Sequence, residues 1–123
     1  MKTIAVLSAS QTGAASALSP TLTTDGTNFL TCTGFAITGG GATAASLVTA
    51  TLTGATGGTL SYVIAVPAGV TLGITPLVVQ FDPPLVSASN NTSIVLNVPS
   101  FGAGNTAAAA NLQGTKGSRQ LNA

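Results

Sequence analysis

Few side chains in this sequence could act as acids, bases, nucleophiles or charged metal ligands. Apart from Tyr62, they are Asp25, Asp82, Cys32, Lys2, Lys116 and Arg119. The chain contains no His and no Glu. General acid–base catalysis needs a titratable side chain poised near the working pH, and a Ser or Thr nucleophile needs a neighbouring base. The many hydroxyl groups have almost no base to activate them, so the sequence predicts that the protein is not an enzyme.

The same residues argue against a bound metal or cofactor. A tetrahedral zinc site usually takes four Cys or His ligands, whereas this chain has one Cys and no His. The dense acidic loop of a calcium-binding EF-hand is also missing. We therefore predict no metal and no cofactor. A single Cys cannot form an internal disulfide, and we interpret Cys32 as a small buried hydrophobic residue rather than a reactive thiol.

The charge content restricts the partners that the chain can bind. Charged residues make up 4% of the sequence and the formal net charge is +1, whereas soluble domains carry about 25% charged residues. A free subunit with so few charges has little repulsion to oppose self-association, which indicates a structural subunit. Residues 3–115 contain no Lys or Arg, so nucleic acid is not an expected partner. No apolar run reaches the length of a membrane span, and we predict no membrane partner.

Thr- and Val-rich segments alternate with Gly and Pro, which favours strands and turns over helices. The expected strands cover residues 4–8, 28–38, 47–53, 60–66, 77–81, a segment ending at Pro99, and 106–113. This pattern predicts an all-β fold, namely an antiparallel β-sandwich or jelly roll of about seven to eight short strands with extended terminal arms. We expect a single domain over 1–123, with an N-terminal arm or first strands over 1–24 and a C-terminal tail over 114–123.

Several turn signals set the expected strand boundaries. Asp25-Gly26 predicts a hairpin turn, since both residues tolerate positive φ. Pro83-Pro84 predicts the end of a strand, because proline cannot donate to a β-ladder. The run Gly39–Gly41 is interpreted as a turn, because no helix or Lys follows to complete a phosphate loop. Asn90-Asn91 contains two overlapping glycosylation sequons, and we favour a turn there as well.

The N-terminal segment allows two interpretations. It has a Lys, a short apolar run and an Ala-rich stretch, as a secretory signal does. The apolar run is continuous only from Ile4 to Leu7, however, whereas a signal needs about 7–15 apolar residues. We favour a first strand or an ordered arm over a cleaved signal.

The region from about Leu30 to Gly114 resembles small proteins encoded among the head-morphogenesis genes of tailed bacteriophages. The similar segments are GFAITGGGATAASLVTATLTG, GGTLSYVIAVPAG and PLVVQFDPPLVSASNNTSIVLNVPSFGAGNTAAAANLQG. Proteins of this kind include capsid decoration, head-stabilising and head-fibre proteins. The resemblance implies a β-sandwich that binds the outside of an assembled shell, with the major capsid protein or other virion subunits as partners. It also implies homo-oligomers, with trimers favoured, and a virion location after assembly in the host cytoplasm.

The expected subunit contacts lie in the terminal arms and in two Gly/Pro-rich loops. Lys2, Lys116 and Arg119 lie near the ends of the chain, where they either reach acidic patches on a neighbour or keep exposed ends solvated. The loops contribute Pro83, Pro84 and Phe101. The leading hypothesis is a capsid decoration or stabilising protein. The alternatives are a tail, neck or fibre-base component, and a secreted adhesin or carbohydrate-binding β-sandwich.

Overall fold

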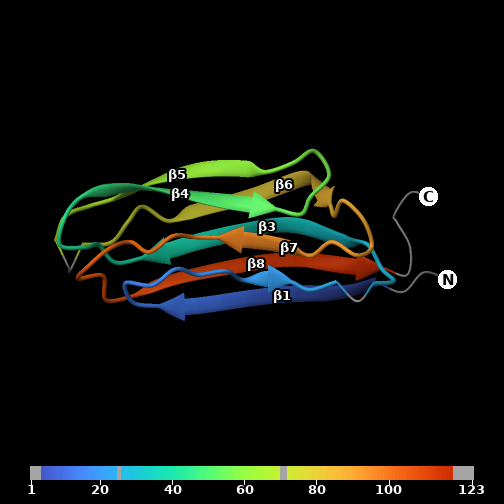
Figure 1. Cartoon of the computed structure of the whole chain (residues 1–123), viewed down its shortest axis with the longest axis horizontal. Helices are drawn as coiled ribbons and strands as arrows, with labels where there is room; N and C mark the ends of the chain where they lie inside the picture. Colours follow the sequence, from blue (N-terminus) through green and yellow to red (C-terminus); the bar gives the residue numbers. More distant parts are fainter. Residues whose placement is uncertain (1–3, 25, 70–71, 118–123) are drawn as a thin grey trace.

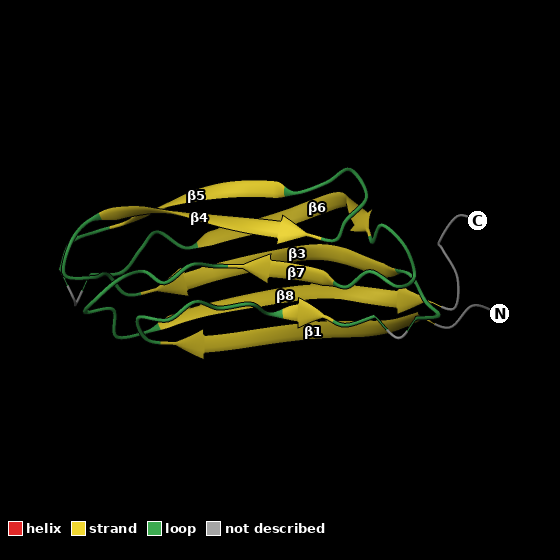
Figure 2. Ribbon diagram, in the orientation of Figure 1, coloured by secondary structure: helices red, strands yellow, loops and turns green. Residues whose placement is uncertain are grey.

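The computed structural model of the chain describes residues 4–24, 26–69 and 72–117, and these contain strands and loops but no helix (Figure 2). The eight strands are β1 (Ile4–Gly13), β2 (Thr21–Leu22), β3 (Leu30–Gly39), β4 (Ser46–Thr53), β5 (Leu60–Val66), β6 (Leu77–Val86), β7 (Ile94–Asn97) and β8 (Ala108–Gly117). They run along the long axis of the molecule (Figure 1). The predicted all-β fold is confirmed.

The strands form two antiparallel four-stranded sheets with the orders β1-β8-β3-β6 and β2-β7-β4-β5. Each strand of the first half pairs with its counterpart from the second half: β1 with β8, β2 with β7, β3 with β6, and β4 with β5. Two further pairings, β3 with β8 and β4 with β7, complete the sheets. This is a long four-pair antiparallel ribbon rolled into two layers, the arrangement of a jelly roll.

The core lies between the two sheets because the apolar residues of each strand alternate with polar ones. In β4, the side chains of Val48, Ala50 and Leu52 are buried, while the Thr residues between them are exposed or half-buried. In β3, the register against β8 shifts between Cys32 and Gly34. Such a bulge adds one residue to the strand, which lets both Cys32 and Phe35 face the core.

The prediction that Pro83-Pro84 ends a strand is wrong. β6 continues through both prolines to Val86. The strand is at the edge of its sheet, and its register against β3 jumps from Gln80 to Leu85. Residues 81–84 therefore lack partners in the ladder, so the missing proline N–H groups cost no hydrogen bonds.

The predicted hairpin at Asp25-Gly26 is also wrong. The flanking strands β2 and β3 belong to different sheets, so the segment between them connects the two layers. Asp25 itself lies outside the described residues. By contrast, Gly39 ends β3 and residues 89–91 form a turn, as expected.

We call β1-β8-β3-β6, whose strands have ten residues each, the larger sheet, and β2-β7-β4-β5 the smaller sheet. Both β1 and β8 belong to the larger sheet. β1 pairs with β8 along its whole length, from Ile4 opposite Gly117 to Gly13 opposite Ala108. β8 therefore includes residues 114–117, which the sequence assigns to a tail. The apolar segment 4–7 is part of a ten-residue strand in the sheet.

Candidate interaction surface

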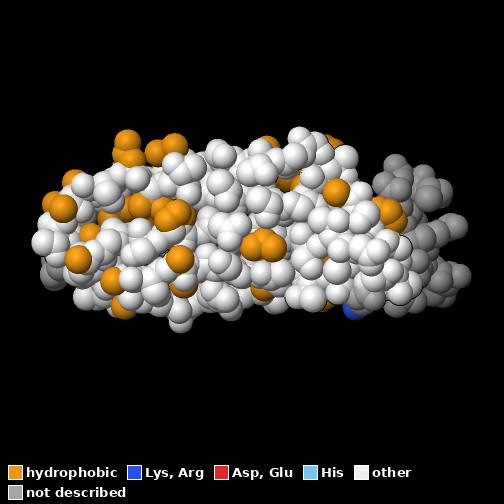
Figure 3. Space-filling view, viewed as in Figure 1, with side chains coloured by type: hydrophobic (Ala, Val, Ile, Leu, Met, Phe, Trp, Pro, Cys, Tyr) orange, Lys and Arg blue, Asp and Glu red, His pale blue; other side chains and the backbone are white. Residues whose placement is uncertain are grey.

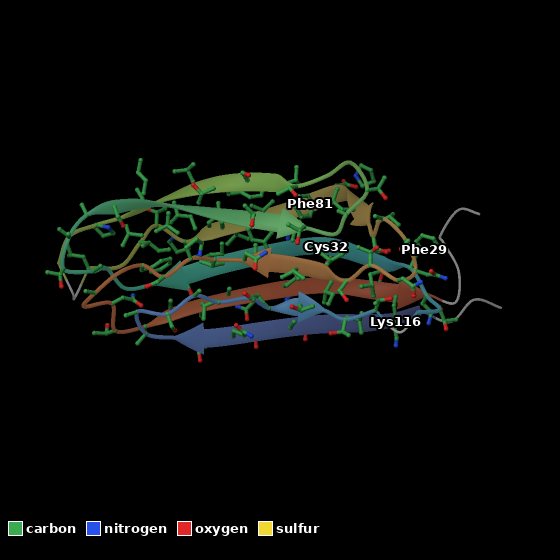
Figure 4. All side chains as sticks on the ribbon, in the orientation of Figure 1. Phe29, Cys32, Phe81 and Lys116 are labelled. Carbon is green, nitrogen blue, oxygen red and sulfur yellow. The ribbon has the colours of Figure 1, made fainter. Side chains whose placement is uncertain are left out.

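The titratable side chains in the described part of the chain do not form a cluster. No group of three His, Cys, Asp or Glu side chains that could hold a metal occurs within the described ranges. Asp82 is exposed on β6 and Lys116 is half-buried near the end of β8. Figure 4 places Cys32 inside the sandwich and Lys116 at one end of the molecule.

The interpretation of Cys32 as a buried hydrophobic residue is confirmed. Its side chain is 0% exposed, and its thiol makes a weak hydrogen bond to the carbonyl oxygen of Gly34 at 3.8 Å. Burial raises the pKa of this thiol and outweighs the effect of the Gly34 backbone, which lowers it. The thiol is therefore held neutral and away from solvent, which is not the environment of a reactive Cys.

This burial predicts a loss of stability at alkaline pH. Above about pH 8.5 the thiol loses its proton in the unfolded chain, whereas the buried thiol keeps it. The native state then binds more protons than the unfolded state, so the free energy of unfolding falls as pH rises. Tyr62 adds a loss of the same sign at higher pH, because burial, and secondarily the charge of Cys32, raise its pKa. Urea unfolding at pH 7 and pH 9.5 measures the effect. The Cys32→Ala variant should show a smaller fall between these pH values, and an unchanged fall would contradict the assignment.

The structure distributes the predicted contact residues over different environments. Pro83 and Pro84 are exposed on the edge strand β6, and Lys116 is half-buried on β8. Lys2 and Arg119 lie outside the described residues. Phe101 is 2% exposed and belongs to the core, so the expectation that it contacts a partner does not fit its burial.

Asn105 explains why the loop around Phe101 is held inside the fold. Its side-chain nitrogen donates to the carbonyl oxygens of Gly40 at 2.7 Å and Ala107 at 3.0 Å. Its side-chain oxygen accepts a hydrogen bond from the backbone N–H of Ala15 at 2.9 Å. Asn105 is 5% exposed, and these bonds join the segments before β2, after β3 and before β8. Sequence inspection assigns this Asn to a loop because nothing local indicates its two distant partners, Ala15 and Gly40.

We expect Asn105→Ala to lower the free energy of unfolding by about 2–3 kcal/mol, because it removes three partly buried hydrogen bonds, each of which contributes about 1 kcal/mol. Chemical denaturation of the two proteins measures the difference. Asn97→Ala is the matched control, since Asn97 makes a single exposed side-chain bond, to Ser19 at 3.3 Å, and should change stability by less than about 0.5 kcal/mol. Equal losses in the two variants would contradict the role given to Asn105.

Exposed apolar side chains occur on the outer face of the smaller sheet. Leu47 on β4 is 74% exposed and Val63 on β5 is 65% exposed. Leu47 is also part of a hollow of about 570 Å³, which is lined by Ala45, Ser46, Leu47, Ala65, Val66, Pro67, Gly73, Ile74 and Thr75. Figure 3 shows hydrophobic side chains gathered toward the end of the molecule where β4 begins and β5 ends. A partner bound there would meet an apolar surface.

A second apolar region follows the side of the sandwich formed by the edge strands β5 and β6. Their core-facing side chains Tyr62, Leu77, Val79 and Phe81 are only half-buried. Phe35 lies between the two strands, with its ring centroid 5.1 Å from that of Tyr62 and 6.1 Å from that of Phe81. We call these four half-buried side chains the open seam. The core is incompletely covered along the seam, and sequence inspection misses it because strand order is not visible in a single sequence.

Comparisons with known proteins yield no relative: no family model, curated protein or solved structure matches the chain. Among the described residues there is no helix long and apolar enough to cross a membrane.

Proposed function

We propose that the protein is a virion structural subunit, and that it acts as a capsid decoration or stabilising protein on the outer surface of a bacteriophage head. The observation that carries the proposal is the jelly-roll strand order combined with an almost uncharged surface. Jelly rolls are common in viral capsid proteins, although lectins and cupins share the fold. Because one fold hosts many functions, the strand order supports the proposal by analogy.

The small number of charges on the surface, together with its exposed apolar side chains, gives a second argument for a structural subunit. Asp82 and Lys116 are the only charged residues in the described part of the chain, whereas large apolar side chains such as Leu47 and Val63 are exposed. Such a surface suits a protein that works packed against other subunits. The resemblance of residues 30–114 to phage head proteins supports a phage head as the assembly.

The proposed mechanism is mechanical. Each subunit would bridge neighbouring capsid proteins and bury apolar surface, which contributes about 25 cal/mol per Å² before the costs of association. Many copies on one shell would reinforce one another through multivalency. This mechanism makes and breaks no covalent bond, which suits a chain with so few titratable side chains.

A mixing experiment tests this function. Purified protein is added to empty phage heads that lack it, and the particles are imaged while bound copies are counted. Saturable binding at regular lattice positions is the expected result and would identify the symmetry axis. Binding to tails, or no binding to particles at all, would reject the decoration function.

A polar hollow favours a second candidate, the binding of a neutral carbohydrate. The outer face of the larger sheet has a hollow of about 420 Å³ whose lining includes Gln80, Asn111 and Gln113. Within the described segments, no side-chain hydrogen bond engages these three amides, so their donors and acceptors are available to sugar hydroxyls. Titration with neutral oligosaccharides, followed by NMR, should shift the amide signals of these residues. Unchanged spectra would remove this candidate.

A further inference from the structure

The two sheets have four edge strands, and three of them are poor templates for pairing with another chain. β6 carries Pro83 and Pro84 in a segment without ladder partners, β2 is only two residues long, and β1 is rich in Ser, Thr and Gln from Ser8 onward. β5 is different: its seven residues, LSYVIAV, are mostly apolar and contain no charge and no proline. Natural proteins usually protect such edges because they pair readily with other strands.

β5 also has apolar side chains left uncovered on both faces. Val63 is 65% exposed on the outer face. On the core-facing side, Leu60 is 36% exposed and Tyr62 belongs to the open seam. A strand added beside β5 would therefore complete the backbone ladder and cover apolar surface on both faces of the sheet.

We propose that β5 pairs antiparallel with β5 of a second copy of this chain, across a twofold axis that passes through Val63. The smaller sheets of two subunits then join into one continuous eight-stranded sheet. The pairing sets Leu60 opposite Val66, Tyr62 opposite Ile64, and Val63 opposite its own copy. Cross-strand pairs of aromatic, β-branched and aliphatic residues are the kind that stabilise antiparallel sheets.

The absence of charge along β5 supports a second copy of the chain as the partner of this edge strand. In a twofold interface each residue near the axis meets its own equivalent, so a single charge there would repel itself. β5 and its neighbour β4 carry no charged residue. Of the described charges, Lys116 belongs to β8, and Asp82 belongs to β6 on the other side of the open seam. A charged partner would find no opposite charge on β4 or β5 to attract it.

The proposal is independent of the virion location, and it predicts dimers rather than the trimers that the phage resemblance implies. Sedimentation velocity of the purified full chain should show a species of twice the 11.8 kDa chain mass. Val63→Lys places two like charges at the axis and should shift the protein to monomers at the same concentration. Because Val63 is largely exposed, this variant should keep its fold, which circular dichroism verifies.

Cysteine crosslinking locates the interface. Val63→Cys brings two thiols opposite one another at a separation suited to a disulfide, so oxidation should give covalent dimers. Val78→Cys is the matched control, since Val78 is equally exposed at 65% but lies on β6. We expect the Val63→Cys variant to crosslink at least about tenfold faster, because pairing raises the effective thiol concentration. The native Cys32 is buried and does not compete.

Three results would overturn the proposal. The first is a monomer at all concentrations up to about 1 mM, a range in which even weak pairs are detected. The second is equal crosslinking of the two Cys variants. The third is faster crosslinking of Val6→Cys, which would move the pairing to β1, where Val6 is 85% exposed. Failure of the mixing experiment with phage heads would leave all of these readouts unchanged, so the two proposals are tested separately.

Discussion

Replacing Phe101 by alanine should lower the free energy of unfolding by about 3–5 kcal/mol, the range for removing a fully buried aromatic side chain. Phe101 is among the largest fully buried side chains of the protein. Its ring packs so closely on β3 that a Cβ added at Gly39 would lie 2.6 Å from it. The truncation therefore leaves a cavity at the end of the sandwich, next to the bonds made by Asn105.

Urea denaturation followed by fluorescence or circular dichroism measures this loss. Phe29→Ala is the control with the same chemical change, because Phe29 is only half-buried and lies near the opposite end of the molecule (Figure 4). It should lose clearly less stability. If Phe101→Ala kept its full stability and instead weakened binding to a partner, the assignment of Phe101 to the core would be wrong.

The second large effect is expected for Gly114→Ala, which should cost about 3 kcal/mol, the upper end of the usual range for overpacking. Gly114 lies on β8, opposite Cys32 of β3. A Cβ at this position would collide with the carbonyl oxygen of Thr31 and lie 2.8 Å from Cδ1 of Leu22. Backbone movement cannot relieve the collision cheaply, because β8 is held on both sides by β1 and β3.

Thermal and chemical unfolding of Gly114→Ala test this prediction. Gly40→Ala is the matched control, since the nearest atom to a Cβ at Gly40 is Oγ1 of Thr106, at 3.5 Å, an ordinary contact distance. The control should unfold close to the unmodified protein. A Gly114→Ala variant as stable as Gly40→Ala would mean that β8 does not approach Thr31 of β3 and Leu22 of β2 as closely as described.

Local patterns in the sequence predict the strands that have clear alternation and clear limits. β5 begins at Leu60 and ends at Val66 as expected, because Gly57-Gly58 and Pro67 bound an alternating segment. β4 is predicted to within one residue for the same reason. These limits depend on neighbouring residues alone, which is why a single sequence is sufficient for them.

Features that depend on distant partners are the ones that the sequence analysis missed. β6 passes through Pro83-Pro84 because it is an edge strand with an irregular register, and edge position depends on strand order. Residues 114–117 extend β8 because β1 and β3 pair with them. Phe101 is buried although its loop is rich in Gly. The β5 edge and the open seam likewise result from topology, so no local pattern could have indicated them.

The position of β8 has a consequence for synthesis of the chain on the ribosome. Among the described strands β8 is made after the other seven, yet it lies between β1 and β3 and separates them in the finished sheet. Until residues 108–117 leave the ribosome, β1 has no neighbour to pair with, and β3 has only β6. Pairing of β1 with β8 also brings together segments far apart in the sequence, which slows folding. The larger sheet can therefore assemble only after residues 108–117 have been made. Until then β1 and β3, which carry no charged residue, lack their partner, and solubility during this interval depends on how quickly β8 inserts.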